Sequence, residues 1–178
     1  FSRLIVGFYI GLESPSWDAA TLALINMVTP KRAYCQAHGI EITEAQWPSH
    51  HLPDQLLCDR GEMVGYNASN LVKHLGVQIK NAPPYRADWK GIVERNFRLM
   101  NREIHWLPGA VLGPKERGTR DTRLDAALTL SEFRAIMIWC IWEHNNYHRM
   151  PWFELDEEMI RDRVLPFPVD LWRWGAQH

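Results

Sequence analysis

Two acidic residues, Asp59 and Glu94, have the type and the placement to bind a divalent cation. Asp59 follows the short apolar run 56–58, and sites in open α/β sheets are built at the carboxyl ends of strands. Glu94 lies in the first turns of an expected helix, at the edge of its apolar face. Carboxylates from two elements suit Mg²⁺, and two ions about 3.5–4 Å apart can hold both reacting oxygens of a phosphodiester.

Basic residues accompany Glu94 along the chain. Lys90 at i−4 and Arg98 at i+4 share its side of the helix, and Arg86 precedes the helix. Residues 83–123 hold 9 basic and 5 acidic side chains, although the net charge of the chain is −1. We therefore expect Arg86, Lys90 and Arg98 to bind DNA phosphate. A purely structural interpretation stays open, in which Asp59 caps a turn and Glu94 pairs with Lys90.

The motifs around these residues resemble a known superfamily. Residues 56–62 resemble the second-aspartate strand of the retroviral integrases and transposases, and residues 82–97 resemble their glutamate motif. Asp59 and Glu94 are 35 positions apart, as in the integrase-type D,D-35-E arrangement. Residues 2–9 resemble the second strand of the superfamily. Residues 123–133 and 168–175 resemble segments of its TnsB-type DDE transposases.

This resemblance implies a TnsB-type catalytic core. The implied fold class is α/β, an RNase H-like mixed sheet flanked by helices, with the first strand missing from this chain. Asp59 and Glu94 would be the second and third catalytic acids of a two-metal site for Mg²⁺ or Mn²⁺. The implied activity is that of a polynucleotidyl transferase, which cleaves transposon 3′ ends and joins them to target DNA. Because the first aspartate would lie upstream of Phe1, we expect this chain to be inactive alone, with Glu62 the nearest substitute.

The resemblance also implies partners: transposon-end and target DNA, an endonuclease partner, an ATP-dependent regulator and a target selector. It implies a homo-oligomer on DNA, in the cytoplasm of a bacterium and associated with the nucleoid. Two other functions stay open. One is a metal-dependent nuclease of the same fold that cuts without joining. The other is a non-catalytic DNA- or protein-binding module.

Apolar patterning and turn residues predict the elements that would position these groups. The expected strands are 3–13, 56–58 and 77–80. The expected helices are 17–27, a second piece ending near 38, 68–74, 88–105, and one capped by Thr129 or Ser131 that ends near 147. Residues 107–128 read as a long loop, whose Arg117, Arg120 and Arg123 either meet DNA phosphate or are simply solvated. We assign 1–150 to the core and 151–178 to a C-terminal extension, in which Trp172 and Trp174 would alternate if extended.

Composition narrows the class of protein. With 46% hydrophobic and 23% charged residues, the chain is not disordered, and no apolar run is long enough to span a membrane. Cys35, Cys58 and Cys140 form no C-x-x-C pair, which fits a reducing compartment. The chain starts at Phe1 in strand-like sequence, which suggests a fragment. His144 and His148 have a zinc-compatible spacing, but we expect surface histidines at a helix end, where the dipole favours them.

Overall fold

The computed structural model describes residues 1–14, 16–58, 74–81, 87–110 and 121–178. Within these residues the fold is mostly helical. The α-helices are α1 (Trp17–Val28), α2 (Lys31–Gln36), α4 (Ala87–Glu103), α5 (Leu130–Tyr147), α6 (Glu157–Arg161) and α7 (Pro168–Gly175). Two 3₁₀ helices, η1 (Glu44–Gln46) and η2 (Thr122–Asp125), accompany them. The strands β1 (Gln55–Cys58) and β2 (Gln78–Asn81) pair in parallel, with Gln55 opposite Gln78.

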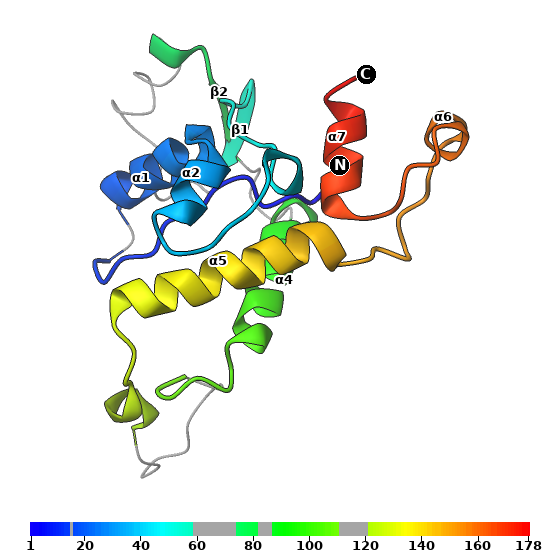
Figure 1. Ribbon diagram of the computed structural model, residues 1–178. Helices are drawn as coiled ribbons and strands as arrows, with labels where there is room; N and C mark the ends of the chain where they lie inside the picture. Colours follow the sequence, from blue (N-terminus) through cyan, green and yellow to red (C-terminus); the bar gives the residue numbers. More distant parts are fainter. Residues whose placement is uncertain (15, 59–73, 82–86, 111–120) are drawn as a thin grey trace.

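Helix α5 is the element around which the others pack. It contacts α4, α7 and η1, and α4 crosses it in Figure 1. Its start is fixed by the sequence Thr129-x-x-Glu132, because the Thr129 hydroxyl accepts from the Glu132 N–H and the Glu132 carboxylate accepts from the Thr129 N–H. Helix α1 begins in a similar way at Ser16, whose side chain accepts from the Ala19 N–H.

The main core lies between α5, α2, α4 and the segment before η1. Its buried members are Cys35, Ile42, Trp47, Met100, Ile138 and Ile141. Phe8 from the N-terminal segment stacks on Trp47 with ring centroids 6.4 Å apart. Apolar side chains from five separate parts of the chain therefore share this core, and their burial is its main source of stability.

The expected strand 3–13 is wrong: the N-terminal segment is extended but belongs to no strand. Side chains satisfy its backbone instead. Asn145 on α5 accepts from the Ile5 N–H at 2.9 Å and donates to the Ile5 carbonyl at 3.1 Å, while Trp47 Nε1 donates to the same carbonyl at 2.9 Å. Asn26 accepts from the Phe8 N–H at 3.1 Å. A buried backbone must be paired, and here polar side chains take the place of neighbouring strands.

The expected α/β fold class is also wrong. The described residues contain no RNase H-like mixed sheet, but two parallel strands of four residues each. The strands were correctly located by their apolar runs, at 56–58 and 77–80. The RNase H-like sheet was implied by the resemblance, and the N-terminal apolar run was interpreted as one of its strands. Such a run does not reveal whether another strand pairs with it.

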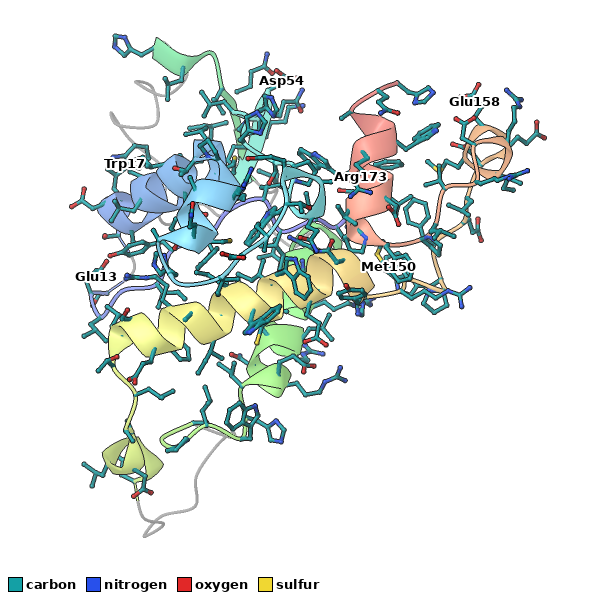
Figure 2. The ribbon with its side chains drawn as sticks, in the orientation of Figure 1. Glu13, Trp17, Asp54, Met150, Glu158 and Arg173 are labelled. Atoms are coloured by element: carbon teal, nitrogen blue, oxygen red, sulfur yellow. The ribbon has the colours of Figure 1, made fainter. Side chains whose placement is uncertain are left out.

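The C-terminal residues form helices rather than an extended tail. Pro168 occupies the first turn of α7, where its missing N–H costs nothing. Trp172 and Trp174 therefore lie on a helix and do not alternate between two faces; both are half-buried. Met150, labelled in Figure 2 near the end of α5, forms a second buried cluster with Met159 and Leu171. The assigned boundary at residue 150 stays a prediction.

The remaining expectations on helices divide into two groups. Those for α1, α2, α4 and α5 are confirmed to within two or three residues at their ends. Residues 68–73 of the expected helix 68–74, and the central part of the 107–128 loop with Arg117 and Arg120, lie outside the described residues. Among the helices that the structure describes, none has the length and apolar character needed to cross a membrane.

Candidate nucleic-acid interface

The predicted site residues are only partly within the described structure. Asp59 and Arg86 lie outside it, and Lys90 is described only as part of the α4 backbone. Glu94 and Arg98 are exposed on α4. The expected approach of Asp59 to Glu94, and the alternative pairing of Glu94 with Lys90, therefore stay predictions.

Helix α4 carries a row of exposed arginines. Arg95, Arg98 and Arg102 follow one another at three- and four-residue spacing, which places them on one side of the helix. Arg102 has a distant ion pair with Glu103, at 3.6 Å, and the Arg102 side chain is 71% exposed. A pair so exposed contributes little to stability. The row is therefore available to a polyanion, and sequence analysis missed Arg95 because it considered only the i±4 neighbours of Glu94.

Two histidines, His144 on α5 and His148 directly after it, lie beside this row. His144 is only 6% exposed, so the expectation of a surface histidine is wrong for this residue. Its Nε2 donates to the Arg3 carbonyl at 3.4 Å, and its ring stacks on that of His148 at 4.9 Å between centroids. Burial, and to a smaller extent His148, lower the pKa of His144, against the opposing effect of the Arg3 carbonyl. His144 is therefore a neutral hydrogen-bond donor at neutral pH.

A zinc site at these histidines gains no support from the structure. The described residues include no group of three or more His, Cys, Asp or Glu side chains that could hold a metal ion. One ring nitrogen of His144 is also engaged by the Arg3 carbonyl. The predicted Mg²⁺ site depends on Asp59, so the described residues do not test it.

The apolar stripe of α4 is only partly buried. Met100 is 7% exposed and belongs to the core, whereas Phe97, one turn earlier, is 66% exposed and Val93, two turns earlier, is 56% exposed. The periodicity correctly predicted one apolar face. It did not predict that the apolar side chains nearer the N-terminal end of the helix would be exposed to solvent.

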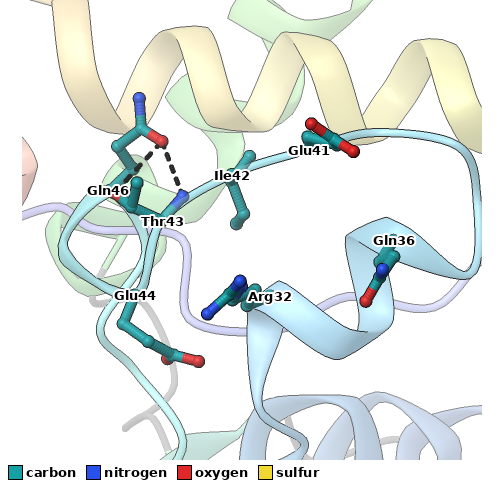
Figure 3. A pocket seen from close by; sticks show the side chains of 7 residues that line it. All are labelled: Arg32, Gln36, Glu41, Ile42, Thr43, Glu44 and Gln46. Atoms are coloured by element: carbon teal, nitrogen blue, oxygen red, sulfur yellow. Dashed lines mark hydrogen bonds between the residues drawn. The ribbon is translucent and has the colours of Figure 1, made fainter.

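A separate hollow of about 480 Å³ lies between α2 and η1 (Figure 3). Arg32, Glu41 and Glu44 give it mixed charge, and no ion pair joins Arg32 to either acid. The Gln46 side chain is used to cap η1, since its Oε1 accepts from the Thr43 N–H at 2.8 Å. The hollow has two acids and one cation among its lining residues, which does not suit a polyanion, so we assign the candidate interface to α4.

The chain matches proteins of DNA transposition. Residues 1–109 match the family described as the TnsB C-terminal domain. Over 182 aligned residues the chain is 44% identical to the transposon Tn7 transposition protein TnsB of Escherichia coli, and the match covers all of this chain. The chain spans about a quarter of that relative, since the match covers 26% of its length.

These matches correct the interpretation of the chain as an integrase-type catalytic core. The matching family is a C-terminal domain rather than a catalytic core, and the described fold lacks the expected mixed sheet. The resemblance to TnsB proteins was correctly found, but the part of the protein was wrongly assigned. By its match over residues 1–109, the chain belongs to the family of TnsB C-terminal domains.

Proposed function

We propose that this chain works in DNA transposition as a DNA-binding part of a TnsB-like transposition protein. The observation that carries the proposal is the 44% identity, over the whole chain, to a protein named as a transposition protein. Of the functions left open by the sequence, this is the non-catalytic module that binds DNA.

The surface of α4 supports DNA as the ligand. Arg95, Arg98 and Arg102 are exposed, and the ion pair of Arg102 with Glu103 is weak. Guanidinium groups bind phosphate oxygens with two parallel hydrogen bonds. Contacts of this kind place a protein on the DNA backbone without reading its sequence. We retain Arg86 and Lys90, which precede this row in the sequence, as proposed phosphate ligands.

Cleavage and joining of DNA are not part of this proposal. They were implied by the catalytic-core interpretation, which the family match corrects. The expected partners are an endonuclease, an ATP-dependent regulator, a target selector and further copies of the protein. Association with them would be a property of a whole transposition protein, and this chain spans only 26% of the length of its TnsB relative. We retain these partners as proposals for that larger protein.

The test is binding of a fluorescently labelled DNA duplex at several salt concentrations. Each phosphate contact contributes a slope of about −0.9 to the plot of log K against log salt. Arg98→Ala and Arg102→Ala should each weaken binding and reduce the magnitude of the slope by about that amount. Arg161→Ala, which removes the same charge from exposed α6, is the matched control and should change neither quantity. Absence of salt-dependent binding by the unaltered chain would refute the proposal.

A further inference from the structure

A cavity of about 320 Å³ lies where the N-terminal segment meets α4 and the end of α5. Its volume is that of a small-ligand site. Five polar side chains and one indole line it: Arg3, Arg95, Asn96, His144, His148 and Trp152. Met150 completes its apolar part and is labelled in Figure 2, close to the end of α5.

Among the described residues, the lining of this cavity is basic and includes no acid. Neither Arg3 nor Arg95 has an ion-pair partner within the described part of the chain. Glu103 and Glu143, acidic side chains of α4 and α5, line the adjoining cavity instead. Two guanidinium groups without a carboxylate suit an anion, and their planar fork matches phosphate.

Arg3 is held in an unusual backbone conformation at this cavity. Its φ of 61° is in the left-handed region, which a residue with a side chain rarely adopts. The carbonyl of Arg3 accepts a hydrogen bond from His144, and its guanidinium carbon lies 5.7 Å from the centre of the Trp152 ring. Strained residues held by their surroundings in this way concentrate at functional sites. The fold thus holds the backbone of Arg3 at this cavity, with its guanidinium against the Trp152 ring.

We propose that this cavity binds a phosphodiester group of DNA, with Arg3 and Arg95 as its cationic ligands and His148 as a further hydrogen-bond donor. The proposal rests on the proposed DNA-binding function and adds a specific site to it. Arg95 connects the two, because it both lines the cavity and belongs to the exposed row of α4. DNA lying along that row would place one phosphate at the cavity.

The first test separates binding from folding by two substitutions. Arg95→Ala and Arg3→Gly should each weaken duplex binding about tenfold and reduce the salt slope by about 1. Arg3→Gly should leave the melting temperature nearly unchanged, because glycine adopts the positive φ without strain. A large drop in melting temperature with unchanged DNA affinity would assign Arg3 to the fold and overturn the site. Arg161→Ala on α6 again serves as the charge-matched control.

The second test separates DNA from free phosphate as the source of the anion. Inorganic phosphate and a mononucleotide are titrated while the ring resonances of His144 and His148 are followed by NMR. We expect the duplex to shift these resonances at far lower concentration than either small anion. If phosphate alone saturates the shift and Arg3→Gly and Arg95→Ala bind duplex normally, the cavity is a free-phosphate site and the proposal is wrong. That outcome would leave the proposed DNA-binding function intact. If the unaltered chain does not bind the duplex at all, the proposed function itself is refuted.

Discussion

Lys31 is buried at the end of α1, where its ammonium group takes the place of water as the hydrogen-bond donor to the helix carbonyls. Its Nζ donates to the carbonyls of Asn26, Met27 and Thr29 at 2.6, 2.9 and 2.9 Å. The last carbonyls of a helix have no partner within the helix and carry a partial negative charge. One ammonium group therefore satisfies three of them and connects α1 to α2.

The titration of Lys31 and its neighbour Cys35 predicts the pH dependence of stability. Burial lowers the pKa of Lys31 to about 8 and raises the pKa of Cys35 to about 11. Between pH 8 and the ordinary lysine value of 10.5, the unfolded chain holds the Lys31 proton and the native state does not, so stability rises with pH. Between the ordinary cysteine value of 9.0 and 11, the native state keeps the Cys35 proton, so stability falls.

We therefore expect the free energy of unfolding to rise from pH 8 to 9 and to level off from 9 to 10.5, where the two effects oppose each other. Cys35→Ala removes the opposing effect of Cys35, so between pH 9 and 10.5 its stability should rise relative to that of the unaltered chain. Urea unfolding at fixed pH values measures both curves. Curves of identical shape for the unaltered chain and Cys35→Ala would contradict this assignment.

The predicted Mg²⁺ pair, Asp59 and Glu94, has a test that does not depend on catalysis. A cation that binds only the native state raises the melting temperature by mass action. Added Mg²⁺ should stabilise the chain, and Asp59→Asn and Glu94→Gln should each abolish that effect. Glu103→Gln, at the other end of α4, is the matched control and should respond like the unaltered chain. An equal response in all four proteins would rule out a specific site.

At the scale of elements, the N-terminal segment depends on Asn145. This side chain is fully buried and makes two hydrogen bonds to the backbone of Ile5. Asn145→Ala leaves the Ile5 N–H unsatisfied, while Trp47 still donates to the Ile5 carbonyl. We expect a loss of about 2–3 kcal/mol in the free energy of unfolding, measured with urea. Asn101→Ala, on the exposed side of α4, should cost much less, and an equal cost would argue against this role of Asn145.

Helix α4 offers a comparison within one apolar stripe. Met100→Ala should cost about 2–4 kcal/mol because it leaves a cavity in the main core. Phe97→Ala, which removes a side chain that is 66% exposed, should cost less than about 1 kcal/mol. Thermal and urea unfolding of the two variants test this order. A reversed order would mean that the exposed end of the stripe is covered in solution.

The elements that sequence analysis located correctly have local signals. Ser16, the pair Thr129 and Glu132, and Gly39 with its φ of 74° each mark a helix end through contacts within a few residues. Strand pairing has no such signal, so the pairing expected of residues 3–13 was wrong. The side-chain contacts of that segment come from residues as far as 140 and 141 positions away, such as Asn145 and His144. Arg3 was missed as a site residue for the same reason.

At the scale of the whole molecule, charge is unevenly distributed although its sum is −1. Residues 83–123 hold 9 basic and 5 acidic side chains, and residues 124–178 hold 5 and 9. Acidic α6 stands apart from α4 in Figure 1. A chain without a net positive charge gains little from long-range attraction to DNA. Affinity must then come from contacts of the basic part with phosphate.

The salt dependence of DNA binding can distinguish local contacts from overall charge. Counterion release depends on how many phosphates the protein neutralises, and each contributes about 0.9 to the slope. Glu157→Gln with Glu158→Gln raises the net charge by two on α6, where we expect no DNA contact. This double variant should bind slightly tighter at low salt, with an unchanged slope. Arg98→Ala with Arg102→Ala lowers the net charge by two on α4, and should reduce the slope by about 2. Equal and opposite slope changes in the two double variants would show that overall charge, rather than the arginine row of α4, governs binding.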